Sequence, residues 1–146
     1  MSPGLKRTVA IALAAVFALL SAFHVVGALG AWTSLPIIPT VPGELAQWPS
    51  SLSWMGVAGA LALAAVVVLT RGDLILRSLP PWLSTTACLV LGAVFVLRAI
   101  GEFRFLGFFK TIAGTDFAFW DTWLYTPLCL ALGLGALWLA STPRTR

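Results

Sequence analysis

Residues 52–70 read LSWMGVAGALALAAVVVLT and contain no charged side chain. A bilayer core about 30 Å thick requires about 20 consecutive apolar residues in a helix, so this stretch predicts a membrane-spanning helix. The whole chain of 146 residues is 60% hydrophobic and 10% charged, with a mean hydropathy of +0.98. These polar groups are too few to cover a soluble fold. A soluble enzyme, a nucleic-acid-binding protein and a disordered tail are therefore excluded.

Three further stretches resemble the first in length and apolarity: residues 8–30, 83–101 and 122–140. Backbone amides in lipid must be hydrogen-bonded within a helix or a closed barrel, and these runs are continuously apolar rather than alternating, which favours helices. We therefore predict an all-α bundle of four transmembrane helices that forms a single membrane domain over residues 1–146. The first stretch is about twice as long as the apolar core of a signal peptide, so we expect it to be retained.

Basic residues favour the cytoplasmic side of a membrane. They cluster on one predicted side, before the first span, between the second and third, and after the fourth: Lys6, Arg7, Arg71, Arg77, Arg144 and Arg146. The other side carries Arg98, Arg104 and Lys110. We therefore expect a multi-pass protein of the cell membrane with both termini in the cytoplasm. The inner loop, residues 71–81, reads as a basic hairpin without chemistry of its own.

The two outer loops have distinct compositions. Residues 31–51 contain four prolines and one charged residue, Glu44, which favours an extended backbone. Such a loop either lies in the headgroup region or folds back as a lid over the bundle. Residues 102–120 hold six of the nine phenylalanines. Four apolar residues there follow helical spacing and predict either a short interfacial helix or a continuation of the third span: Phe105, Phe108, Phe109 and Ile112.

Small residues and a proline give further expectations about the spans. Small residues four apart allow close helix contacts, and the candidates are Gly56, Ala60 and Ala64 in the second span and Gly92 with Val96 in the third. Pro127 should kink the fourth span and leave a carbonyl free near Trp123. Cys88 and Cys129 form no CxxC motif, so they are expected to be packing residues.

Ionisable and polar residues inside spans are costly and therefore suggest function. His24 lies about 9 Å below the outer end of the first span, at 1.5 Å per residue. Arg98 and Glu102 are four residues apart at the outer end of the third span and are able to pair. Asp121 begins the fourth span, with Tyr125 one turn deeper on the same face. Three helices thus contribute to one polar layer in the outer third of the membrane.

Two kinds of role are open for this layer. The side chains could simply anchor, cap or hydrogen-bond helix ends. Alternatively, Arg98 could bind an anionic headgroup, Glu102 and Asp121 could act as general acid and base, and His24 could move a proton. The chain contains no HxxxH or HExxH pair, so we expect no metal and no other cofactor.

The runs Leu97–Lys110 (LRAIGEFRFLGFFK) and Phe117–Cys129 (FAFWDTWLYTPLC), together with His24, resemble an uncharacterised family of small bacterial four-helix integral membrane proteins, a domain of unknown function. The resemblance spans most of the chain and implies the same bundle fold. It implies no reaction.

The leading functional hypothesis is a binding protein or accessory subunit with a pocket for a lipid or other amphiphile near the outer leaflet. Its ligand-binding residues would be Arg98, Glu102, Asp121, Tyr125 and His24. One alternative is a small isomerase- or hydrolase-like enzyme that acts on a lipophilic substrate with Glu102 and Asp121, assisted by His24. Another is a subunit of an oligomeric transporter. Expected partners are the bilayer, a second copy of the chain or another membrane protein, and no nucleic acid.

Overall fold

A computed structural model describes residues 3–31 and 49–143 of the chain. Within these residues, four helical runs are long and apolar enough to cross a membrane. They are α1 (Pro3–Ala28), α2 (Ser51–Arg71), α3 (Pro81–Ile100) and the combined run Asp116–Ser141. The predicted all-α bundle of four transmembrane helices is confirmed. The alternatives for the proline-rich loop fall mostly on residues 32–48, which lie outside the described part.

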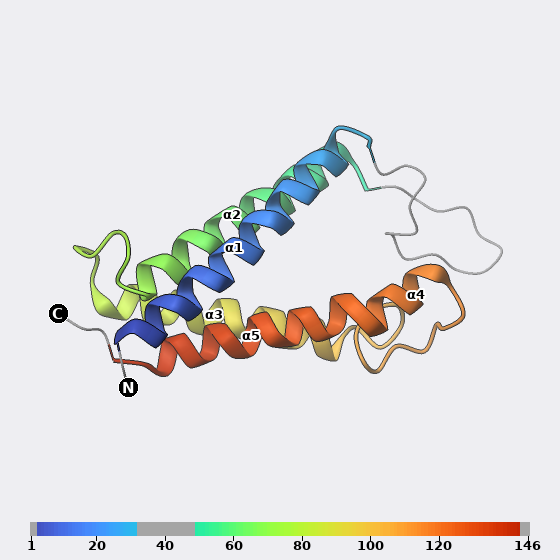
Figure 1. Cartoon of the computed structure of the whole chain (residues 1–146). Coiled ribbons are helices and arrows are strands. Elements are labelled where there is room, and N and C mark those ends of the chain that lie inside the picture. The colour runs from blue at the N-terminus through green and yellow to red at the C-terminus, as the bar shows by residue number, and fades with distance from the viewer. Residues whose placement is uncertain (1–2, 32–48, 144–146) are drawn as a thin grey trace.

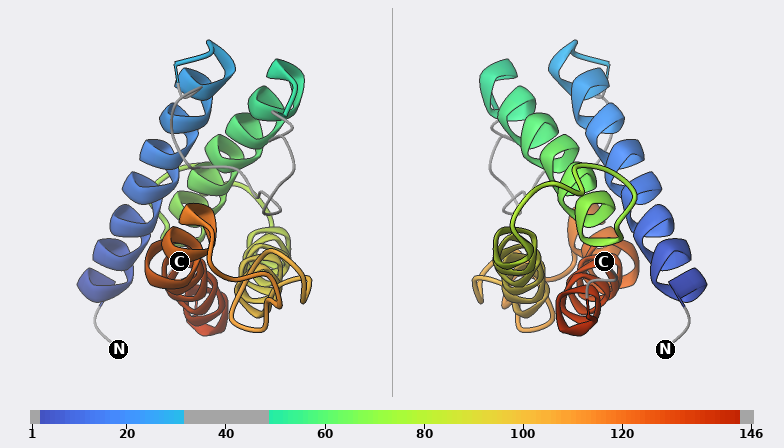
Figure 2. Two further views of the ribbon diagram at one scale, coloured as in Figure 1. Left: turned by 90° about the vertical axis from the view of Figure 1, so that its right-hand side faces the viewer. Right: turned by 90° about the vertical axis from the view of Figure 1, so that its left-hand side faces the viewer.

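The helices form two antiparallel hairpins (Figure 1). Helix α1 packs mainly on α2, and α3 packs mainly on the C-terminal helix α5 (Thr126–Ser141). Figures 1 and 2 show the two hairpins meeting at the end where α1 begins and α5 finishes, and diverging toward the opposite end. We call the end where the hairpins meet the closed end, and the end where they diverge the open end.

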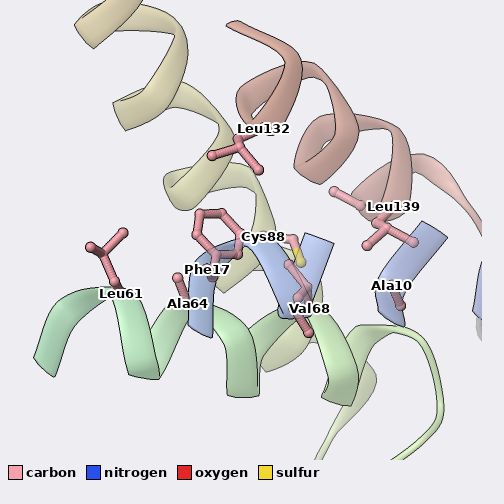
Figure 3. Close-up of a cluster of buried hydrophobic side chains, with 10 residues drawn as sticks. Ala10, Phe17, Leu61, Ala64, Val68, Cys88, Leu132 and Leu139 are labelled. Carbon is pink, nitrogen blue, oxygen red and sulfur yellow. The ribbon is translucent and has the colours of Figure 1, made fainter. Parts of the chain in front are cut away.

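The buried core lies between the hairpins and draws on every spanning helix (Figure 3). Phe17 of α1 is fully buried, and its ring meets Phe95 of α3 edge-on at 5.2 Å between centroids. Many large apolar side chains face outward instead, among them Leu19, Leu52 and Trp123, each more than 70% exposed. An outer surface of this kind suits contact with lipid chains, because apolar side chains need no hydrogen-bonding partners in the hydrocarbon core of a bilayer.

Glycines allow a close helix crossing between α3 and α5. A Cβ atom at Gly133 would lie 2.9 Å from the Val96 nitrogen and 3.0 Å from the Gly92 oxygen. The small-residue contact predicted around Gly92 and Val96 is therefore present. The one predicted around Gly56 is wrong at that residue, because a Cβ there would meet nothing within 4 Å.

The closed end contains a buried ionic contact that the sequence analysis missed. The Lys6 ammonium donates to the Asp73 carboxylate at 2.6 Å and to the Pro143 carbonyl at 3.0 Å. Arg71 donates to the carbonyls of Ala140 and Thr142. Helix α1 begins at Pro3 rather than near residue 8, so Lys6 lies inside the helix and is only 2% exposed. The inner loop, expected to be an unremarkable basic hairpin, thus ties the start of α1 to the end of α5.

No helix forms over residues 102–112, so both predictions for the phenylalanine-rich loop are wrong there. Helix α3 ends at Ile100, and Gly101, Phe103 and Gly107 have φ values of 95°, 66° and 83°. A right-handed helix cannot pass through such positive φ angles. The loop instead folds back on itself, with the Ile112 amide donating to the Arg104 carbonyl at 2.9 Å.

The last span begins with a short helix, α4 (Asp116–Trp120), which Thr115 caps through its side chain. A π-helical turn, η1 (Asp121–Tyr125), then leads into α5. The turn lies directly before Pro127, which cannot donate the backbone hydrogen bond of a regular α-helix. The predicted irregularity at this proline therefore takes the form of a π turn, a feature that is frequent at functional sites.

Candidate functional site

Asp121 is the centre of a polar cluster at the open end, and it is fully buried. Its Oδ1 accepts from Arg98 Nη2 at 2.7 Å, and its Oδ2 accepts from Lys110 Nζ at 3.0 Å. Oδ2 also accepts from the Gly107 amide at 2.9 Å and the Thr126 hydroxyl at 3.1 Å. Four donors from α3, the loop and α5 therefore satisfy one carboxylate, as a buried charge requires.

The expected pairing of Arg98 with Glu102 is wrong. Helix α3 ends at Ile100, so the two residues do not share a helical face. Glu102 lies exposed in the loop, where its Oε1 accepts from the Phe105 amide at 2.6 Å. Arg98 turns to Asp121 instead.

The π turn also changes which residue lies above Asp121. In a regular α-helix, Tyr125 would share the face of Asp121 one turn on. The wider turn η1 places Thr126, five residues on, against the carboxylate. The Tyr125 side chain lines a cavity that is described next.

A cavity of about 300 Å³ lies between the hairpins, toward their open end. Each element contributes side chains at helical spacing, so one face of each helix forms a wall. The walls are Leu20, Phe23 and His24 of α1; Trp54, Val57 and Leu61 of α2; Phe95 and Arg98 of α3; and Phe117, Tyr125, Leu128 and Cys129 of the last span. The lining is mostly apolar, with few polar groups, as in typical small-molecule sites.

Arg98 is the one charged residue in this lining. Its Nη2 is held by Asp121, whereas its Nη1 is buried and has no hydrogen-bond partner among the described residues. A buried donor without an acceptor is costly. Arg98 therefore brings one cationic group, with hydrogen-bonding capacity left over, to the lining of a cavity that is otherwise largely apolar.

His24 and Tyr125 add polar groups to the same cavity. The His24 Nδ1 is 2.7 Å from the Leu20 carbonyl oxygen, which can only accept, so Nδ1 carries a proton. The ring lies 5.3 Å from Trp54 between centroids. Tyr125 packs against Phe117 at 6.1 Å.

The structure thus divides the five sequence-predicted site residues into three groups. Arg98, His24 and Tyr125 line the cavity. Asp121 lies behind Arg98 and positions it. Glu102 belongs to the loop and lines no part of the cavity.

Sequence reasoning missed Lys110 and Thr126 as partners of Asp121. Lys110 falls in the stretch predicted to be an interfacial helix or a continuation of the third span, and only the folded loop brings it back to the start of the last span. A regular helix would also have pointed to Tyr125 rather than Thr126. The signal in the sequence that pointed to such partners was the charge of Asp121, because a carboxylate in an apolar span needs partners.

Neither a metal cluster nor a cysteine pair is present at this site. No group of three His, Cys, Asp or Glu side chains gathers within residues 3–31 and 49–143 in a way that could hold a metal ion. Both cysteines are free. Cys88 is buried in the core, and Cys129 lines the cavity.

These features define a small multi-pass α-helical membrane protein whose hairpins enclose a mostly apolar cavity with one cationic group. The chain belongs to the family described as "Protein of unknown function (DUF3995)", whose model matches residues 3–136. No curated protein and no solved structure matches the chain significantly.

Proposed function

We propose that the protein binds an amphiphile in the cavity between its hairpins, with the polar end of the ligand at Arg98. One observation carries this proposal: a single cationic side chain, Arg98, lines a cavity whose walls are otherwise mostly apolar. A ligand with an acceptor at one end of an apolar body would satisfy both parts of this site.

The polar end should decide affinity. Lipid chains are as apolar as leucine side chains, so moving an acyl chain from the bilayer into the cavity gains little hydrophobic free energy. A hydrogen bond to a charged group contributes more, about 1.5–3 kcal/mol. The apolar walls therefore select shape, and Arg98 selects the headgroup.

The distribution of basic residues supports an orientation in which this site lies near the outer leaflet. Lys6 and Asp73 mark the closed end, and Arg98 and Asp121 mark the open end. The closed end also carries Arg7, Arg71 and Arg77, and by the positive-inside rule it faces the cytoplasm. The two ends of the chain then lie on the cytoplasmic side of the cell membrane, and the cavity opens toward the other side.

Native mass spectrometry of protein purified in mild detergent tests the proposal. Val57 lines the cavity on α2, so Val57→Phe fills part of its volume. Val66→Phe is the matched control, because Val66 is on the same helix and exposed, outside the lining. We expect a bound amphiphile mass on the wild type and on Val66→Phe, and its loss from Val57→Phe. Equal bound mass on all three proteins contradicts the proposal.

The enzyme hypothesis has less support. Glu102 lies on the exposed loop, and the Asp121 carboxylate already accepts from four donors. A general base must reach the proton that it abstracts, and these two carboxylates do not face one common cavity. A role as a subunit of a larger membrane complex is compatible with amphiphile binding, since the apolar outward surfaces can contact another membrane protein.

A further inference from the structure

We propose that the occupant of the cavity is a single-chain, monoanionic amphiphile whose carboxylate binds Arg98. This inference rests on the proposed function and adds the charge and size of the ligand. It follows from the charge balance of the Asp121 cluster, the hydrogen-bonding capacity of Arg98 and the volume of the cavity.

The charge balance favours an anion with one negative charge. Arg98 and Lys110 bring two positive charges to the single carboxylate of Asp121, which leaves one positive charge in excess. Glu102, the acid nearest to Arg98 in sequence, accepts from the Phe105 amide in the loop, and Asp116 is exposed on α4. One carboxylate on the ligand would neutralise the cluster. A phosphate monoester carries about −1.5 to −2 at neutral pH and would reverse its sign.

The hydrogen bonds lead to the same class of ligand. The Asp121 Oδ1 atom accepts only from Arg98 Nη2, and the other three donors bind Oδ2, so Arg98 Nη1 receives no acceptor from this carboxylate. Arginine holds carboxylates with short, charge-assisted hydrogen bonds. Because Asp121 fixes Nη2 at 2.7 Å, the guanidinium is held in place before the ligand arrives, which reduces the entropy lost on binding.

The size of the cavity limits the ligand to one apolar chain or one compact ring system. Its volume of about 300 Å³ is at the lower limit of small-molecule sites. The two acyl chains of a phospholipid do not both fit inside such a volume. Leu61 and Leu128 line the apolar part of the cavity, and Arg98 lies in the last turn of α3.

Titration with three probes that share one chain tests this inference. Oleate, methyl oleate and oleyl phosphate are added to the protein in nonionic detergent, and bound probe is measured by native mass spectrometry. We expect wild type to bind oleate about tenfold more tightly than methyl oleate, and more tightly than oleyl phosphate. Arg98→Met should abolish the preference for oleate over methyl oleate.

Two further variants separate charge at the site from charge nearby and from misfolding. Arg104→Met removes an exposed arginine of the loop whose guanidinium lies 4.9 Å from the centre of the Phe105 ring, and it should keep the preference. Val57→Phe keeps Arg98 and blocks the cavity, and it should weaken all three probes. The inference therefore does not depend on the folding of Arg98→Met alone.

The outcomes distinguish this inference from the proposed function. Equal binding of oleate and methyl oleate, weakened by Val57→Phe, would overturn the carboxylate assignment and leave amphiphile binding standing. Tightest binding of oleyl phosphate would overturn the assignment of a single charge. An equal loss of preference in Arg98→Met and Arg104→Met would assign the effect to surface charge. Wild type that binds none of the probes above the level of Val57→Phe overturns both proposals.

Discussion

Arg98 Nη2 and Asp121 Oδ1 lie 2.7 Å apart across the contact between α3 and the last span, although 23 positions separate the residues in the sequence. The pair joins the two helices of one hairpin at its open end. It also holds the arginine that lines the cavity. The stability of the fold and the proposed ligand recognition therefore depend on the same contact.

Loss of the Asp121 charge should destabilise the fold. Asp121→Asn leaves the Arg98 and Lys110 cations near a neutral amide that brings its own donors. Removing one partner of a buried ion pair costs about 3–5 kcal/mol, and partial exposure of Arg98 places the expected value near the lower limit. Denaturant unfolding in detergent measures it. Asp116→Asn, an exposed acid on α4, is the control, and equal stability of the two variants contradicts this expectation.

The closed end should behave as a second anchor. Lys6→Met leaves the Asp73 carboxylate without its 2.6 Å partner and should lower the free energy of unfolding by about 3 kcal/mol. The neighbouring exposed Arg7→Met should change it little. A double-mutant cycle with Asp73→Asn measures the coupling directly. A coupling energy near zero would show that the contact contributes nothing.

The α3–α5 crossing should not tolerate a methyl group at Gly133. An alanine Cβ would lie 2.9 Å from the backbone nitrogen of Val96, and backbone cannot move aside as a flexible side chain can. We expect Gly133→Ala to cost about 1–3 kcal/mol. Gly56→Ala on α2 meets open space and should be neutral or slightly stabilising. Thermal unfolding compares the two, and the reverse order would exclude this close crossing.

Glu102 should be dispensable for ligand binding. Its Oε1 accepts from the Phe105 amide in the exposed loop, and the residue does not line the cavity. Glu102→Gln should therefore leave oleate affinity unchanged within about twofold, while Arg98→Met lowers it about tenfold. A loss of oleate affinity as large as that in Arg98→Met would show that Glu102 belongs to the binding site.

The proposed orientation predicts opposite labelling of the two loops. A cysteine at Ser78, exposed in the α2–α3 loop, and one at Thr111, exposed in the α3–α4 loop, are introduced separately with Cys88 and Cys129 replaced by serine. In intact cells, a membrane-impermeant maleimide should label the Thr111 position and reach Ser78 only after lysis. The opposite pattern would place the cavity toward the cytoplasm.

The sequence was sufficient to predict the four spans and to indicate Arg98 and Asp121 as charged groups that need partners within them. Continuous apolar runs such as 52–70 leave no alternative to helices in lipid. The cost of ionisable groups in a membrane correctly drew attention to Arg98 and Asp121, because such groups need partners. Those features depend on local composition, which a sequence records directly, and on the lipid solvent that this composition indicates.

Only the tertiary structure decided which side chains pair with one another. Positive φ angles at Gly101, Phe103 and Gly107 end α3 and fold the loop back, which brings Lys110 to Asp121 and leaves Glu102 outside. The π turn before Pro127 replaces Tyr125 with Thr126 at the carboxylate. The Lys6–Asp73 contact joins residues 67 positions apart. Helical periodicity is local, whereas these pairings depend on backbone turns and on how two hairpins meet, and no spacing along the chain encodes that geometry.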